Sequence, residues 1–238
     1  TYHARGDILI HGSVKMNGGA GNDSLTIFAN SYDGDITIGG SVKMNGQDGD
    51  NKMTLLAKGY NAELTTGSVT MTGGNGNDDL MIRNSYSGGT NLTIKGNVTM
   101  NGDLGYDALT IVSDNNIDDN TSGTLKVTGF VNMSGGNQDD ALYVTSDFEG
   151  LVDIGGNVTL NGNAGIDSLY VRAMYDGDIG IDGKLSLIGR DGNDSLTVEA
   201  FDDYYDFGPS IVSVGSLLLD GGTGNDYLNV YSNDHWYN

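Results

Sequence analysis

The sequence predicts an all-β protein: a parallel β-solenoid of eight coils, each with 27–33 residues and three short strands. Three observations support this prediction. One unit recurs eight times along the 238 residues, apolar residues alternate with polar ones inside each unit, and 39 glycines mark the turns. No segment sustains the period of a helix, and only three of the 32 acidic residues are the helix-favouring Glu. We therefore expect residues 1–238 to form a single solenoid domain.

Each unit contains three apolar–polar alternations, which in the first copy fall at residues 8–10, 14–16 and 25–27. A period of two is typical of short strands with one buried face. One copy cannot bury that face by itself, whereas stacked copies can. Stacking at ~4.8 Å lines equivalent residues into columns. The column that starts at Met16 continues through Met44, Met71, Met100, Met133, Leu160, Leu187 and Leu219.

The composition excludes several functional classes. The absence of Cys rules out a disulfide scaffold, a zinc ribbon and a cysteine nucleophile. The formal charge of −21 argues against a nucleic-acid partner, which requires a basic face on the protein. No apolar run approaches the ~20 residues of a membrane-spanning helix, so we expect no membrane span.

The turn between the second and third predicted strands carries the most regular chemistry. Its first position, beginning at Gly18, is glycine in all eight copies. Its last position is Asp in seven copies and Asn in one. This column consists of Asp23, Asn51, Asp78, Asp107, Asp140, Asp167, Asp194 and Asp226.

This turn resembles the GGxGxD calcium-binding repeat of the RTX, or haemolysin-type, proteins. The clearest matches read GGAGND at 18–23, GGNGND at 73–78 and GGTGND at 221–226. The resemblance implies tight turns with positive φ, and Ca²⁺ held between coils by Asp carboxylates and backbone carbonyls. The glycines that it assigns to such sites are Gly18, Gly21, Gly73, Gly76, Gly221 and Gly224. The RTX repeat occurs twice per coil, whereas this motif occurs once per coil of about 29 residues.

Elementary electrostatics points to the same ion. Stacked carboxylates ~4.8 Å apart repel one another by ~3.5 kcal/mol at an effective dielectric constant of about 20. Hard oxygen ligands without His or Cys favour Ca²⁺ over a transition metal. We therefore predict Ca²⁺ between the coils, with Asn51 contributing its amide oxygen. The alternative interpretation is turn chemistry alone, in which Asx side chains hydrogen-bond their own backbone.

Aromatic residues recur after the third predicted strand. They either form a packing ladder along one edge or present a platform for extracellular glycans, and both interpretations stay open. The residues are Tyr32, Tyr60, Tyr86, Phe148, Tyr175 and Tyr204.

Catalysis finds no support in the sequence. The three histidines, His3, His11 and His235, form no cluster along the chain, and no spacing suggests a nucleophile–base pair. We therefore expect no enzymatic activity and no catalytic residues.

The repeat region shows no polar cap at either end. Strand-like sequence begins by Asp7 and continues to Val230. Uncapped strand edges pair with other chains, and a head-to-tail contact generates an open filament. We therefore predict an extracellular calcium-binding structural protein that stacks head-to-tail with itself into a filament or matrix. The residues expected across that joint are Tyr2, His3, His235, Trp236 and Tyr237.

The alternative hypothesis is a monomeric calcium-binding repeat module of a secreted adhesin or toxin-like protein. Both hypotheses place the protein outside the cell or on its surface, because weak calcium sites need the millimolar calcium found there.

Overall fold

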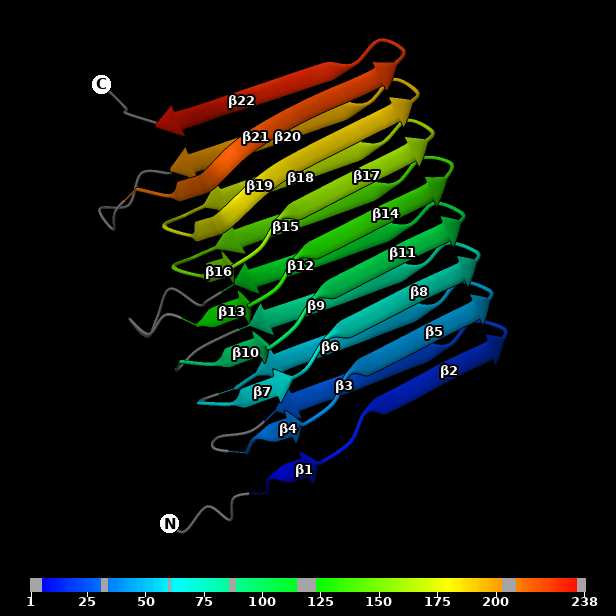
Figure 1. Cartoon of the computed structure of the whole chain (residues 1–238), viewed down its shortest axis with the longest axis vertical. Coiled ribbons are helices and arrows are strands. Elements are labelled where there is room, and N and C mark those ends of the chain that lie inside the picture. Colours follow the sequence, from blue (N-terminus) through cyan, green and yellow to red (C-terminus); the bar gives the residue numbers. More distant parts are fainter. Residues whose placement is uncertain are drawn as a thin grey trace.

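The computed structural model describes residues 6–30, 34–59, 61–85, 89–114, 123–202 and 209–234. Within these ranges every regular element is a β-strand, and the strands stack along one long axis (Figure 1). Every strand pair is parallel. The predicted all-β parallel β-solenoid is confirmed. The described part of the chain contains no helix that is long and apolar enough to cross a membrane.

In the first six copies each coil contributes three separate strands. The short first strands are β1 (Ile8–Ile10), β4 (Ile36–Ile38), β7 (Glu63–Thr66), β10 (Asn91–Ile94), β13 (Thr124–Val127) and β16 (Leu151–Ile154). The second strands are β2 (Val14–Ala20), β5 (Val42–Asp48), β8 (Val69–Asn75), β11 (Val98–Leu104), β14 (Val131–Asn137) and β17 (Val158–Ala164). The third strands are β3 (Ser24–Asn30), β6 (Lys52–Lys58), β9 (Asp79–Ser85), β12 (Ala108–Asp114), β15 (Ala141–Asp147) and β18 (Ser168–Met174).

The last two copies depart from the predicted three-strand pattern. Their first and second strands run together as β19 (Asp178–Asp191) and β21 (Ile211–Thr223), and their third strands are β20 (Ser195–Asp202) and β22 (Tyr227–Asp234). A register shift between Ile181 and Lys184 marks the corner that interrupts the strand in the other copies. The prediction of three separate strands is wrong for these two copies, because strand pairing continues through the corner.

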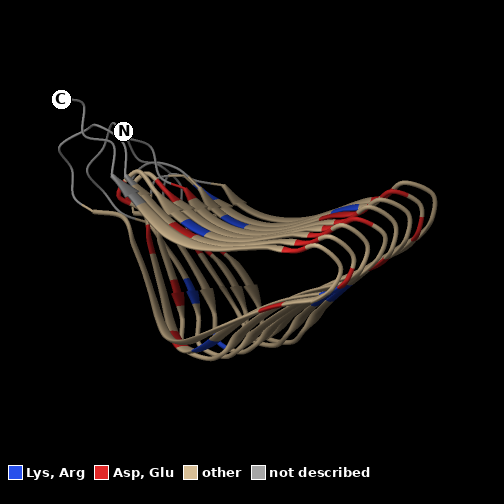
Figure 2. Cartoon of the chain, turned by 90° about the horizontal axis from the view of Figure 1, so that it is seen from above, with Lys and Arg blue, Asp and Glu red and all other residues tan. Residues whose placement is uncertain are grey.

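The strands form two sheets. The 14-stranded sheet runs from β1 through the short strands to β19 and returns through the second strands to β2, with β21 joined to β19. The 8-stranded sheet contains the third strands, from β3 to β22. Seen along the long axis, the coils superimpose into a three-sided section (Figure 2). The eight layers are separated by seven intervals and correspond to about seven full turns, slightly fewer than the eight coils predicted.

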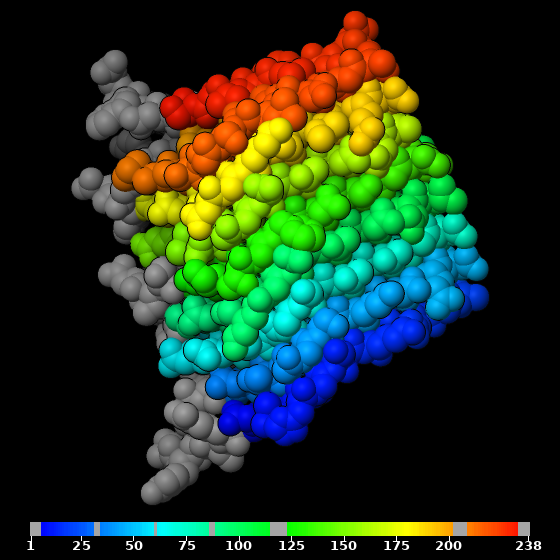
Figure 3. Space-filling model, viewed as in Figure 1, coloured from blue at the N-terminus to red at the C-terminus, as the bar shows by residue number. Residues whose placement is uncertain are grey.

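The register confirms the predicted apolar columns. Met16 lies opposite Met44, and Met44 lies opposite Met71. Met44 and Met71 are both 0% exposed, and each apolar side chain of this size contributes about 1.5–3 kcal/mol when it is buried. On the outer face of the 14-stranded sheet the coils form successive bands (Figure 3). Residues of one column therefore line up along the long axis, both inside and outside the solenoid.

Candidate functional site: the aspartate ladder at the glycine turn

The predicted aspartate column lies along one edge of the solenoid. Each of its members follows the second strand of its copy and precedes the third. Acidic residues gather around this turn in the end-on view (Figure 2). We call this column the inner ladder. It consists of Asp23, Asn51, Asp78, Asp107, Asp140, Asp167, Asp194 and Asp226.

Inner-ladder side chains are hydrogen-bonded to the preceding coil. The backbone N–H of Asp107 donates to Oδ1 of Asp140 over 2.8 Å, and the N–H of Asp140 donates to Oδ1 of Asp167 over 2.8 Å. The same bond occurs at all seven intervals of the ladder, with N···O distances of 2.7–3.1 Å. The ladder therefore satisfies backbone N–H groups at a corner where regular strand structure is interrupted.

The one amide in the ladder makes the same bond. Oδ1 of Asn51 accepts from the N–H of Asp23 over 3.1 Å, and Nδ2 of Asn51 donates to the carbonyl of Gly49 over 2.7 Å. The turn-chemistry interpretation assumed that these side chains bond their own turn. Asn51 does so in addition, but the bond shared by the whole ladder joins neighbouring coils.

The second carboxylate oxygen of the ladder has no partner. Oδ2 is buried without a hydrogen bond in Asp23, Asp78, Asp107, Asp140, Asp167 and Asp194. This oxygen lies against the first glycine of its own turn: a Cβ built on Gly162 would meet Oδ2 of Asp167 at 2.1 Å. A buried carboxylate oxygen without a donor carries a full desolvation cost. The ladder therefore needs a proton or a cation to compensate it.

The predicted glycines have two different roles. Gly21, Gly76 and Gly224 adopt φ values of 107°, 125° and 135°, as the resemblance implied. For the first glycine column the implied positive φ is wrong, because these residues are needed for space beside the carboxylate. The Cβ-to-Oδ2 distance would be 2.5 Å at Gly18, 2.3 Å at Gly73 and 2.3 Å at Gly221.

A second positive-φ position escaped the sequence analysis. It follows the first glycine of each turn, and its residue type varies between glycine and large polar side chains, which hid the pattern. Its members are Gly19, Gln47, Gly74, Asp103, Gly136, Asn163, Arg190 and Gly222, with φ between 80° and 139°.

Burial raises the pKa of the central inner-ladder carboxyls. Asp140 is 3% exposed, and loss of solvation raises its pKa to about 7, although the N–H of Asp107 counteracts this effect. The charges of Asp107 and Asp167 raise it further. Loss of solvation likewise raises the pKa of Asp107 and of Asp167 to about 6. A cation-free ladder therefore holds protons close to neutral pH.

A second Asx column, one residue before the inner ladder, was not predicted to bond between coils. We call it the outer ladder: Asn22, Asp50, Asn77, Asp139 and Asn193. Oδ1 of Asp50 accepts from the N–H of Asn77 over 2.8 Å, and Oδ1 of Asp139 accepts from the N–H of Ile166 over 2.7 Å. These side chains are exposed and bond the following coil. A turn with Asx residues at both positions is thus joined to the coils on both sides.

The inner ladder offers calcium the right type of donor. Oδ2 of Asp107 and the carbonyl oxygen of Gly135 are hard oxygens from adjacent coils, and both lie against Gly102, where a Cβ would meet them at 2.2 Å and 2.5 Å. A calcium ion takes about six to eight oxygens. Among the described residues no group of three or more His, Cys, Asp or Glu side chains could hold a metal ion, so the remaining ligands must be carbonyls or waters. Calcium binding therefore stays a prediction.

The aromatic column is described in part. The rings of Phe148 and Tyr175 stack with centroids 4.8 Å apart at 9°, and Tyr175 meets Phe201 edge-on at 5.9 Å. These rings pack against one another, as the packing-ladder interpretation requires. Tyr32, Tyr60, Tyr86 and Tyr204 lie outside the described residues.

All five residues predicted at an end-to-end joint also lie outside the described ranges: Tyr2, His3, His235, Trp236 and Tyr237. Of the three histidines, His11 is described, and it is exposed at the corner before β2.

Comparison with known proteins adds no relative to this picture. No family model, no curated protein and no solved structure matches the chain.

Proposed function

We propose that this chain is an extracellular structural protein whose solenoid stacks end to end with further copies into a filament, with Ca²⁺ bound along the inner ladder. The proposal rests on the strand edges that are unpaired at each end of the described stack. Within the described residues β1, β2 and β3 each pair on one side, and so do β21 and β22 at the other end. An unpaired strand edge is a template for another strand.

Apolar exposure at the two ends supports this assembly. Leu228 and Val230 in the last layer are 45% and 59% exposed, whereas Leu142 and Val144 in the same columns of an inner layer are both 0% exposed. In the first layer Ile8 is 53% exposed. A further layer at each end would bury these side chains as inner layers do.

The Asx ladders give the two ends complementary hydrogen-bonding groups. Along the inner ladder, each backbone N–H donates to the carboxylate or amide oxygen of the following layer. Asp226 is in the last layer, so its N–H would face Oδ1 of Asp23 in the next copy. Asn225 occupies the outer-ladder position of the last layer, where its N–H donates to Oδ1 of Asn193, and its own side chain would accept from the N–H of Asn22 in the next copy. Because the two ends differ, this contact is heterologous and generates an open filament.

Electron microscopy and sedimentation of the purified chain test the assembly. We expect filaments at high protein concentration in millimolar calcium, with a thickness that matches one solenoid. Val230→Lys places a charge on the end face and should shift the chain to monomers. Leu104→Lys is the matched control, because Leu104 is 44% exposed on the side of the solenoid and not at an end. Folded monomers at every concentration would contradict self-stacking, and so would equal effects of both variants.

Calcium binding has a separate test. Isothermal titration with CaCl₂ should detect sites in the wild type and a reduced number in Asp140→Asn, since the amide keeps the ladder bond, as Asn51 does, but loses the charge. Asp139→Asn removes one charge from the exposed outer ladder and should leave calcium binding close to that of the wild type. Weak sites of this kind fill at the millimolar calcium found outside cells. An unchanged titration in Asp140→Asn would refute the calcium sites and leave the stacking proposal untouched.

A further inference from the structure

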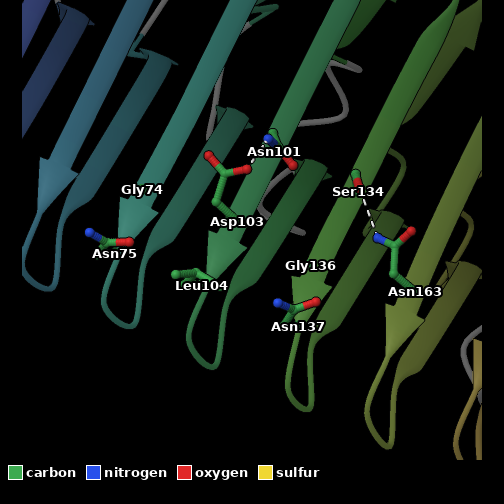
Figure 4. A pocket seen from close by; sticks show the side chains of 9 residues that line it. All are labelled: Gly74, Asn75, Asn101, Asp103, Leu104, Ser134, Gly136, Asn137 and Asn163. Atoms are coloured by element: carbon green, nitrogen blue, oxygen red, sulfur yellow. Dashed lines mark hydrogen bonds between the residues drawn. The ribbon is translucent and has the colours of Figure 1, made fainter.

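A polar hollow lies on the outer face of the 14-stranded sheet, away from both ends and outside the inner ladder. It crosses β8, β11, β14 and β17 and has a volume of about 560 Å³ (Figure 4). Four successive coils contribute to its lining, so its long direction follows the axis of the solenoid.

The hollow exists because residue size alternates in the positive-φ column that follows the first glycine of each turn. Gly74 and Gly136 have no side chain and form low points, whereas Asp103 and Asn163 in the intervening coils project from the same position. Asp103 and Asn163 adopt φ values of 80° and 81°, in a left-handed region where Asn and Asp are enriched among residues other than glycine. The backbone therefore holds two polar side chains in fixed positions on either side of an empty glycine position.

The side chains around the hollow are arranged in advance by hydrogen bonds. Nδ2 of Asn101 donates to Oδ1 of Asp103, and Nδ2 of Asn163 donates to Oγ of Ser134 over 2.9 Å (Figure 4). Asn137 lies exposed at the end of β14. Amide, hydroxyl and carboxylate groups on a rigid strand framework are suited to bind hydroxyl groups, each of which donates and accepts a hydrogen bond.

The charge of the site excludes anionic ligands. No Lys or Arg is among the lining residues, Asp103 contributes a carboxylate, and the whole chain carries a formal charge of −21. Leu104 is the one large apolar side chain in the lining. A ligand that fits must therefore carry no negative charge. The amide and hydroxyl groups of the lining favour one that is rich in hydroxyl groups and extended enough to follow several coils spaced ~4.8 Å apart.

We propose that this hollow is a binding site for a neutral polysaccharide chain that lies across the strands, along the axis of the solenoid. The site is distinct from the aromatic column, whose rings pack on one another. It is also independent of filament formation, because its residues lie on the side of the stack and not at its ends.

Titration calorimetry with neutral hexasaccharides tests this site. Cellohexaose, laminarihexaose, mannohexaose and chitohexaose serve as probes. We expect at least one to bind with a Kd of about 1 mM or below. Because the ligand is neutral, the affinity should be the same at about 50 mM and 500 mM NaCl. Absence of binding by all four at tens of millimolar would overturn the proposal, as would preferential binding of the anionic polygalacturonate.

A matched pair of double variants assigns the binding to the hollow. Asn101→Ala with Asn137→Ala should weaken binding about tenfold or more. Asn17→Ala with Asn45→Ala removes two amides from the outer face of β2 and β5, outside the hollow, and should leave the affinity unchanged. Circular dichroism and the midpoint of thermal unfolding establish that both variants fold. Equal losses in the two pairs, or no loss in the first, would place binding elsewhere and refute the site.

Discussion

The inner and outer ladders use the same residue types, one position apart in the same turn. They differ in the free-energy cost of keeping a carboxylate charged. Oδ1 of Asp140 accepts a hydrogen bond from a backbone N–H of the preceding coil, and Oδ1 of Asp139 accepts one from a backbone N–H of the following coil. The N···O distances are similar, 2.8 Å and 2.7 Å. Asp139 is exposed, however, whereas Asp140 is 3% exposed and its Oδ2 has no partner.

This difference shows that repetition alone does not make a column of carboxylates costly. Water screens the outer ladder, so its side chains act as hydrogen-bond acceptors at little electrostatic cost. The inner ladder makes the same bonds without water, so its charge must be suppressed by protons or balanced by cations. The same turn thus combines a structural column with a column that responds to pH and ions.

The largest expected effect comes from filling the space beside an inner carboxylate. In Gly162→Ala the new Cβ would meet Oδ2 of Asp167 at 2.1 Å, and we expect a loss of about 2–3 kcal/mol in the free energy of unfolding. Gly180→Ala is the control, because no atom lies within 4 Å of its Cβ position. Urea unfolding measures both variants. Equal stability of the two would show that the carboxylate does not occupy the space beside Gly162.

The next effect is a pH dependence opposite to that of ordinary salt-bridged carboxylates. The folded state raises the pKa of Asp140 to about 7 and that of Asp107 and Asp167 to about 6, well above the ordinary pKa of an Asp side chain. Between about pH 4 and 7 the folded chain therefore binds more protons than the unfolded chain, so its stability falls as the pH rises. In metal-free buffer Asp140 alone should account for a loss of about 2–3 kcal/mol between about pH 5 and 8.

Urea unfolding across that pH range checks this prediction. General repulsion at a net charge of −21 acts in the same direction, so the informative quantity is the slope in Asp140→Asn compared with the wild type. The slope should be smaller in the variant. A stability that increases from pH 5 to 8 would contradict the buried, unpaired state of the carboxylates.

Asp140→Asn should also stabilise the protein at pH 8 in the presence of a chelator, by about 1–2 kcal/mol. The amide removes a buried charge and keeps the acceptor that bonds the N–H of Asp107. Asp139→Asn, which changes the exposed neighbour, should have an effect close to zero. Thermal unfolding of both variants measures the difference, and a destabilised Asp140→Asn would mean that the charge itself is needed for folding.

The smallest effect is expected in the outer ladder. Asn77→Ala deletes the acceptor for the N–H of Tyr106, a 2.9 Å bond at the exposed turn, and should cost about 0.5–1 kcal/mol at any pH. Asn137→Ala, an exposed amide at the end of β14, is the control. A loss in Asn77→Ala as large as that in Gly162→Ala would remove the distinction between the two ladders.

The repeat pattern predicted much of the fold and of the candidate site. The spacing of Met16, Met44 and Met71 is sufficient to set the strand register, because a slip by one residue would turn an apolar side chain toward water. The same spacing predicted that Asp107, Asp140 and Asp167 stack. It did not predict the continuous strands β19 and β21, because pairing through a corner depends on the neighbouring layer and not on the local sequence.

The sequence by itself determined the parallel stacking, the apolar columns and the single edge on which the aspartates lie, because each follows from a repeated spacing. The tertiary structure decided which way each Asx side chain points, that Oδ2 of the inner ladder is buried beside glycine, and that Gly74 and Gly136 leave a hollow. These features arise from contacts between coils about 27–33 residues apart in the chain. Their direction and burial are fixed only when the neighbouring layer is in place.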